Sequence, residues 1–478
     1  MTIEEYLLKN GPALSSEIIQ HYQNEGLSSE AIRKRLSRLN NPVNKIKGFF
    51  KDNQTFLYHK DHYDDERFYI GLRNAFQKSA KRYYSIIIAL EYHNGFIKKE
   101  DLASYTFSPI KNLKSHKKFS DIINDLIQLN VIFEEEEYYK LSNLFSSRES
   151  NNFQYYKAIE LAKQIIANQF YNYSRSIGLI SYDSGKFNSE FSKFQFCFSA
   201  PSYISGITKF TDKIQPAFVL ADFLIGNNNN ESTTDFFIQK IQIIKSQTNN
   251  NFLPFLITDA LSQDAFKKLK ENGIIIGFVN KLFGSEYEEL LKSLISTITN
   301  AGTILKTNPK AYIDLILQLN KLVDGKTNNL KGDLFELAVG YYYSNLCQSL
   351  DIGKRFNFQG NFREVDVYAT FQEHYIICEC KAYKTQIDKQ IIENWLSNKV
   401  SLIYKSIREY DYNKEIIFEF WSTSGFTEDA INYMLEKQSS LKKYRIKFYS
   451  EKEILEKARK SKANKIVEIM REYFISEV

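Results

Sequence analysis

The sequence of 478 residues predicts an α/β protein made of several domains. Three observations predict this class. Residues 1–60 have the pattern of three helices and a β-hairpin, residues 150–300 alternate apolar runs with helical patterns, and residues 331–430 place strands between helices. We therefore divide the chain into four domains, at residues 1–65, 66–149, 150–300 and 301–478.

Composition and targeting signals predict a protein of the cytoplasm. Hydrophobic residues make up 43% and charged residues 25% of the chain, which is ordinary for a globular protein. No run approaches the about 18 apolar residues of a membrane span, and the acidic N-terminus "MTIEEYLLKNG" does not have the pattern of a secretory signal. The four cysteines form no CxxC pair and the six histidines show no ligand spacing. We expect free thiols, with neither a zinc site nor a disulfide framework.

Domain 1–65 has the element order of a winged helix. Its third predicted helix, "SSEAIRKRLSRL", carries an apolar stripe of Ala31, Ile32, Leu36 and Leu39. The basic residues opposite that stripe are Arg33, Lys34, Arg35 and Arg38. A basic helix in this position favours DNA as a partner; the alternative is a small helical domain whose basic face is only solvated.

The second domain, 66–149, repeats this order loosely. Its hairpin carries an acidic run, Glu134 to Glu137, which would repel phosphates. We expect this domain to serve packing or protein contact.

In the middle domain, apolar runs that alternate with helical patterns predict a mostly parallel sheet covered by helices on both faces. Asp222 lies within one of its apolar strands and is expected to be a hydrogen-bonded structural residue; the alternative is a site carboxylate. Lys240 and Lys245 fall on a helical pattern and are expected to be exposed to solvent. The strands are predicted at 217–225, 252–258 and 273–280, and the helices at 235–246, 261–272 and 285–298.

Two neighbouring strands of the last domain carry the informative polar residues. In "FREVDVYAT" (362–370) Asp366 alternates with apolar residues, and in "YIICECKAY" (375–383) Glu379 and Lys381 share one face. A turn at residues 372–373 makes the two strands a hairpin that places Asp366 opposite Glu379.

Two opposed carboxylates require a cation or a proton. Lys381 could neutralise part of the charge, and Mg²⁺ is typically held by one or two carboxylates with water and phosphate. Glu336, within the apolar helix "KGDLFELAVGYYYSNL", is a third candidate acid. The alternative is an ordinary surface pair of Glu379 and Lys381 on an edge strand.

The motifs "GDLFE", "EVDV" and "ECK", followed by "FWSTSGFTEDA", resemble the PD-(D/E)XK nuclease superfamily, in particular its Mrr-type branch. The resemblance implies a restriction endonuclease-like αβββαβ core. No proline precedes Asp366, and a family glutamine after the lysine has only Gln386 and Gln390 as candidates.

The resemblance also implies the roles of the site residues. Asp366, Glu379 and the main-chain carbonyl of Cys380 would coordinate Mg²⁺, for which Mn²⁺ is an expected substitute. Lys381 would orient or deprotonate the attacking water, and Glu336 would position a second metal or its water.

The expected function is a Mg²⁺-dependent DNA endonuclease in bacterial defence against foreign DNA, with DNA repair as a variant of this context. The alternatives are a non-catalytic DNA-binding regulator or assembly subunit that keeps the nuclease fold as a scaffold, and a nuclease that cuts RNA. A second copy of the chain, or a partner protein of a defence system, is the expected protein partner. The middle domain is hypothesised to be a degenerate copy of the nuclease-like fold without Glu-x-Lys.

Overall fold

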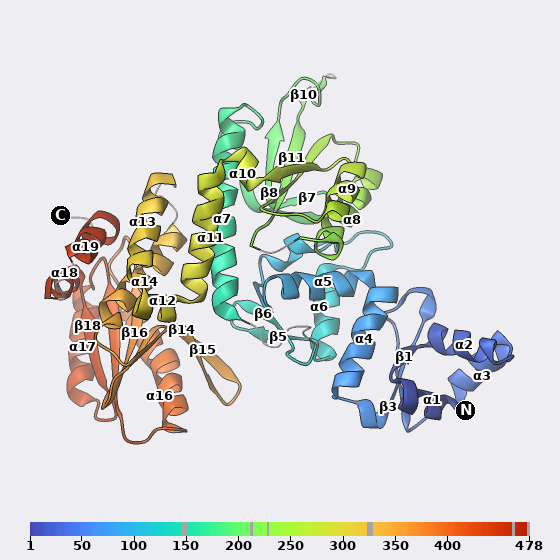
Figure 1. Ribbon diagram of the computed structural model, residues 1–478, viewed down its shortest axis with the longest axis horizontal. Helices are drawn as coiled ribbons and strands as arrows, with labels where there is room; N and C mark the ends of the chain where they lie inside the picture. The colour runs from blue at the N-terminus through green and yellow to red at the C-terminus, as the bar shows by residue number, and fades with distance from the viewer. Residues whose placement is uncertain (146–151, 211–213, 227–228, 323–327, 461–463, 476–478) are drawn as a thin grey trace. The chain divides into compact units, whose positions relative to one another are not determined.

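The computed structural model is a mixed α/β protein that divides into two compact units (Figure 1). Unit 1 consists of residues 1–156 and 166–282, and unit 2 of residues 157–165 and 283–478. The long helix α7 (Phe153–Ser176) contributes residues to both units. The structure describes residues 1–145, 152–210, 214–226, 229–322, 328–460 and 464–475.

The predicted helices and hairpin of the first domain are present. Helices α1 (Ile3–Asn10), α2 (Ser15–Asn24) and α3 (Ser29–Arg38) are followed by strands β2 (Val43–Ile46) and β3 (Phe56–His59), and the short strand β1 (Ala13–Leu14) completes a sheet of order β1-β3-β2. Ser28 caps α3 by accepting a hydrogen bond from the Ala31 N–H, and Ile32 and Leu36 lie in the core. Ala31, which we predicted to lie in the apolar stripe, is exposed because it is one residue out of phase with Ile32.

Residues 66–145 contain helices α4 (Glu66–Ser79), α5 (Lys81–Tyr92) and α6 (Phe119–Gln128). Three strands, β4 (Phe96–Lys98), β5 (Ile132–Glu135) and β6 (Tyr138–Leu141), form a sheet of order β4-β6-β5. The acidic run lies at the β5–β6 hairpin. Lys99 and Lys140 form ion pairs with Glu134 and Glu135 there, at 3.3 and 3.0 Å.

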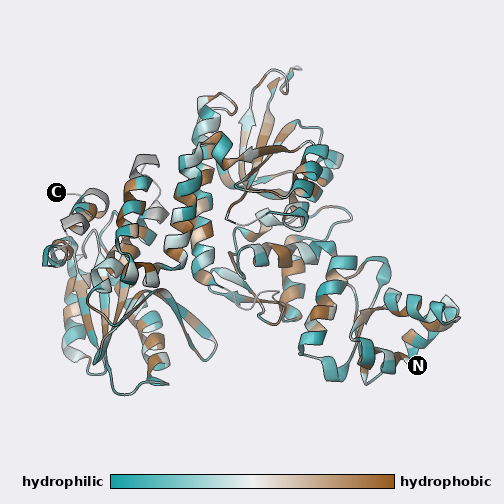
Figure 2. Ribbon diagram, in the orientation of Figure 1, coloured by the Kyte–Doolittle hydropathy of each residue, from teal (hydrophilic) through white to brown (hydrophobic). Residues whose placement is uncertain are grey.

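The middle sheet is mixed, with parallel pairing in one half and antiparallel pairing in the other. Strands β11 (Ala217–Leu224), β12 (Phe252–Thr258) and β13 (Ile275–Phe278) are parallel, as predicted, and are largely hydrophobic (Figure 2). The antiparallel strands β7 (Lys186–Phe191) and β8 (Phe194–Ser202) extend this sheet and were not predicted. Helix α8 (Glu231–Gln247) connects β11 to β12, and α9 (Gln263–Glu271) connects β12 to β13.

The C-terminal sheet, in unit 2, has the order β14-β15-β16-β17-β18. Its strands are β14 (Ser349–Phe358), β15 (Asn361–Thr370), β16 (His374–Lys381), β17 (Glu415–Ser422) and β18 (Arg445–Tyr449). Helix α14 (Asn328–Ser344) precedes the sheet, and α17 (Glu428–Ser440) connects β17 to β18. The long helix predicted between β16 and β17 consists of α15 (Lys389–Asn394), a π-helical segment (Trp395–Val400) and α16 (Ser401–Arg408).

The two five-stranded sheets share one topology. In each, the first three strands in chain order pair antiparallel and the last two pairings are parallel. A helix precedes the first strand, another connects the third strand to the fourth, and another connects the fourth to the fifth. This shared order is what the hypothesis of a duplicated fold requires of the middle sheet.

All four cysteines are free, as expected, with Cys347, Cys378 and Cys380 buried and Cys197 half-buried.

The prediction that Lys240 is exposed is wrong, because Lys240 is fully buried against Asp222. Its Nζ lies 2.6 Å from Asp222 Oδ2 and donates to the main-chain carbonyls of Ser104 and Gln195, at 2.7 and 3.0 Å. Asp222 also accepts a hydrogen bond from the Cys197 N–H at 2.8 Å, so it is a structural residue as predicted. Periodicity within a helix does not reveal a partner on a strand. Lys245 is exposed, as predicted.

Asp222→Ala should destabilise unit 1 by about 3–5 kcal/mol, because it leaves the Lys240 ammonium buried without its counter-charge. The measurement is urea unfolding of the full chain. Lys78→Ala is the control, since it removes the exposed ion pair of Lys78 and Glu17 and should cost less than about 1 kcal/mol. Equal stability of the two variants would contradict the structural role of the buried pair.

Candidate active site

The hairpin of β15 and β16 has the register that the sequence predicts. Val367 pairs with Cys378 and Thr370 with Tyr375, and the Phe371 N–H donates to the His374 carbonyl at 2.9 Å to close the turn. Extending this register by one step places Asp366 opposite Glu379.

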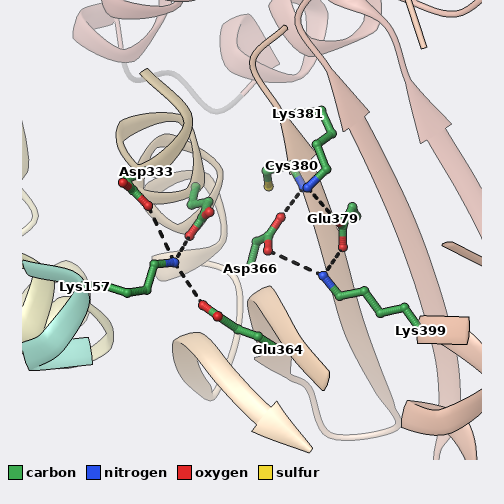
Figure 3. A network of polar contacts seen from close by, with 9 residues as sticks. Lys157, Asp333, Glu364, Asp366, Glu379, Cys380, Lys381 and Lys399 are labelled. Carbon is green, nitrogen blue, oxygen red and sulfur yellow. Dashed lines mark hydrogen bonds and ion pairs between the residues drawn. The ribbon is translucent and has the colours of Figure 1, made fainter. Parts of the chain in front are cut away.

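Asp366 and Glu379 are both buried, at 6% exposure each, and both contact the same lysine (Figure 3). Lys399 Nζ forms an ion pair with Glu379 Oε2 and lies 3.7 Å from Asp366 Oδ1. The other oxygens are also occupied. Lys381 Nζ lies 2.6 Å from Glu379 Oε1, and the Cys380 N–H donates to Asp366 Oδ2 at 2.6 Å. Two carboxylates therefore converge on one cation.

Burial and charge shift the two carboxyl pKa values in opposite directions. Burial alone would raise the pKa of Glu379, but Lys381 and Lys399 outweigh it and lower that pKa to about 2. Burial and the neighbouring Glu379 raise the pKa of Asp366, although both lysines oppose this. In the absence of another cation, Asp366 is thus the member of the pair that takes up a proton more readily.

Lys399 is the site residue that sequence reasoning missed. It lies in the π-helical segment Trp395–Val400, and such segments are frequent at functional sites. One signal for Lys399 was available in the sequence. This lysine lies three residues after Leu396 and next to Val400, and both of these apolar residues are buried in the core. Burial lowers the pKa of Lys399, but Glu379 and Asp366 raise it by more, so the ammonium stays charged. Gln386 and Gln390, the glutamine candidates, are both exposed.

Glu336 belongs to a neighbouring cluster centred on Lys157 of α7. Figure 3 shows Lys157 with Asp333 and Glu364 of this cluster. Lys157 Nζ lies 2.9 Å from Glu364, 3.3 Å from Glu336 and 3.6 Å from Asp333. Burial raises the pKa of Glu336 well above its usual value, which Lys157 opposes. The structure thus brings Asp366, Glu379 and Lys381 together, whereas the ion-pair partner of Glu336 is Lys157.

The donor set of the first cluster fits a hard divalent cation. Mg²⁺ takes oxygen ligands and is commonly held by only two carboxylates, and here two carboxylates already converge on a positive charge. The Cys380 thiol is buried and its pKa is raised well above the usual value, so it is no thiolate ligand. Among the described residues, no group of three or more His, Cys, Asp or Glu side chains is placed to hold a metal ion. Coordination by the Cys380 carbonyl and a second metal at Glu336 stay predictions.

The basic residues predicted to bind DNA are exposed on α3 in unit 1. These are Arg33, Lys34, Arg35 and Arg38. Arg33 lines a hollow of about 500 Å³ together with Ser16, Lys45 and Lys47.

Comparisons with known proteins give only weak likenesses. No family model and no curated protein matches the chain. Among solved structures, protein VC1899 from Vibrio cholerae matches at a TM-score of 0.16 and 7% identity, over 46% of this chain and 51% of that one. Restriction endonuclease FokI bound to DNA matches at a TM-score of 0.19 and 13% identity, over 57% of this chain and 60% of that one. The chain thus spans between half and three fifths of these proteins, and the TM-scores are too low to identify a shared fold.

No helix in the described ranges has the length and apolar character needed to cross a membrane.

Lys381→Met should weaken the pH dependence of stability between pH 6 and pH 3. The folded pKa of Glu379, about 2, lies below the unfolded value of about 4.3, so its ionised form stabilises the fold above about pH 4, and this contribution is lost as the pH falls towards 2. Without Lys381 the folded pKa rises and less stability is gained. Unfolding free energies across this range should show a shallower slope than in wild type or in Lys389→Met, which removes an exposed pair with Glu393. Identical slopes in all three proteins would contradict the coupling.

Proposed function

We propose that the protein is a metal-dependent nuclease that hydrolyses phosphodiester bonds in DNA at Asp366, Glu379 and Lys381. The observation that carries the proposal is the pair of buried carboxylates facing each other across a hairpin, with a lysine two residues after one of them. Structural carboxylates rarely occur in this arrangement, because each raises the cost of burying the other.

A bound Mg²⁺ would act as a Lewis acid on the phosphoryl oxygen and would lower the pKa of a coordinated water. Asp366 and Glu379 would hold the ion. Lys381 is held against Glu379, and although burial lowers its pKa, Glu379 raises that pKa by more, so the side chain keeps its proton. Its role is therefore to orient the attacking water and stabilise charge that develops on the phosphate, rather than to act as the base.

DNA is the proposed substrate because unit 1 offers a basic helix in a winged-helix element order. The charges of α3 are exposed, as phosphate contacts require. Defence against foreign DNA is the proposed context, from the resemblance of the motifs to restriction nucleases. The shared topology of the two large sheets supports the proposal that the middle sheet is a non-catalytic copy of the same fold.

A second candidate function is a non-catalytic DNA-binding scaffold. The observation that favours it is that lysines already neutralise the acids of both clusters, through Lys399 and Lys381 in one and Lys157 in the other. Such pairing stabilises a fold without a metal.

Asp366→Ala and Lys381→Ala should each reduce cleavage of plasmid DNA in Mg²⁺ by at least about a hundredfold, because they remove a metal ligand and the charge beside the phosphate. Lys389→Ala, an exposed lysine of the same unit, is the matched control and should cut like wild type. The panel includes methylated and unmethylated plasmid and a structured RNA. Equal cleavage by wild type and Lys381→Ala would refute the assignment of these residues.

Lys399→Met should bind Mn²⁺ more tightly than wild type, because a cation held by both carboxylates must displace the Lys399 ammonium. A hydrogen bond between charged groups contributes about 1.5–3 kcal/mol, so the gain should be roughly tenfold or more. Calorimetry on the full chain measures it, with Asp366→Asn as the variant that should lose binding.

Two outcomes of this titration separate the hypotheses. Equal Mn²⁺ affinity in wild type and Lys399→Met would show that Lys399 does not compete for the site. Absence of binding in both would favour the scaffold function.

A further inference from the structure

Unit 1 contains a second basic cavity, of about 500 Å³, away from the exposed face of α3. Its walls come from the β2–β3 hairpin at Gly48, Phe49 and Lys51, the α4–α5 junction at residues 79–83, the segment 115–117 before α6, and Gln239 and Ile243 of α8. The β2–β3 hairpin thus carries basic residues around two hollows, with Lys45 and Lys47 at the first and Lys51 at the second.

Among the described residues, four cations and no carboxylate line this cavity. The cations are Lys51, Lys81, Arg82 and Lys117. Lys117 forms an ion pair with Asp125, whose carboxylate also accepts a hydrogen bond from the Tyr83 hydroxyl at 2.5 Å. Within the described part of the chain, Lys51, Lys81 and Arg82 form no ion pair within 4.0 Å. The described residues that line the cavity therefore carry a local excess of positive charge.

Arg82 is the partly buried cation of this cavity that forms no ion pair among the described residues. Its guanidinium is half-buried, and its side-chain contact is with a neutral group, because Nη2 lies 2.7 Å from His116 Nδ1. Burial, followed by the charge of Arg82, lowers the pKa of His116, so His116 accepts this hydrogen bond. A guanidinium has five N–H donors, and a partly desolvated charge is normally paired.

We propose that this cavity binds a backbone phosphate of double-stranded DNA and extends the contact of α3 with the duplex. Arginine binds phosphate through two parallel N–H donors, and the neighbouring lysines add charge without a fixed geometry. The β2–β3 hairpin favours DNA over a free anion, because it joins this cavity to the hollow of Arg33, Lys45 and Lys47. The inference rests on DNA as the partner in the proposed function, and not on cleavage.

The test is binding of a fluorescent duplex of mixed sequence to the full chain in EDTA, over a series of KCl concentrations. Each lost phosphate contact should reduce the slope of log affinity against log salt by about 0.9. Arg82→Gln should lower the slope by about 1 and weaken binding at fixed salt by roughly tenfold. Arg82→Lys should keep most of the slope. Arg67→Gln, the same change at an exposed arginine of α4, is the matched control and should bind like wild type.

A double variant, Lys51→Ala with Lys81→Ala, tests the cavity without disturbing a buried group, because both lysines are exposed. It should lower the slope by about 1.8. Arg33→Gln, measured in the same binding assay, tests separately whether the predicted recognition helix α3 contacts the duplex.

The possible outcomes separate this inference from the proposed function. If Arg33→Gln weakens binding while Arg82→Gln and the double variant bind like wild type, the cavity is no phosphate site and DNA remains the partner. If wild type does not bind the duplex even at low salt, DNA is not the partner and both proposals fail. If millimolar inorganic phosphate protects wild type, but not Arg82→Gln, against thermal unfolding and the duplex does not bind, the cavity serves a free anion and the DNA inference is overturned.

Discussion

The structure of unit 2 depends on neutralising two carboxylates that face each other inside a sheet. Taking one carboxylate out of water is costly, and a second one beside it raises that cost. The chain supplies one lysine from the same strand, Lys381, and another from the following helix, Lys399. Because Lys399 must reach both carboxylates, the helix that carries it has to cross the sheet close to them. Trp395 and Leu396 pack into the core on that helix and hold Lys399 over the carboxylates.

The middle sheet places a comparable pair at the equivalent point of its topology. Asp222 lies on the third strand and pairs with Lys240, 18 residues later on the following helix, whereas Glu379 pairs with Lys399, 20 residues later. The residues around the Asp222–Lys240 pair differ from those around the Glu379–Lys399 pair. Extending the β8–β11 register by one step places Cys197, not an acid, opposite Asp222, and main-chain carbonyls accept hydrogen bonds from Lys240. The Asp222–Lys240 pair therefore has a structural role, whereas Lys399 contacts two acids, Glu379 and Asp366.

The sequence predicted local features well, because alternation and turn length determine them. The positions of β15 and β16, and the register that places Asp366 opposite Glu379 when extended by one step, follow from period-two spacing and a short turn. The sequence did not predict the partners of Lys399 and Lys240, because helical periodicity indicates which face of a helix is buried but not which residues pack against that face. It also could not pair Glu336 with Lys157, which comes from a helix far earlier in the chain. The π-helical segment adds to this difficulty by shifting the helical phase.

Charge balance connects the lysines to the proposed chemistry. With all four groups ionised, Asp366, Glu379, Lys381 and Lys399 sum to zero, which explains how they tolerate burial without a metal. Adding a divalent cation would leave a local charge of +2, which is unfavourable in a buried site unless an anion arrives with it. A phosphodiester supplies that anion, and Mg²⁺ is commonly held by protein carboxylates and substrate phosphate together. Lys381 and Lys399, which neutralise the two acids in the absence of a metal, would then favour binding of metal and substrate together over binding of metal alone.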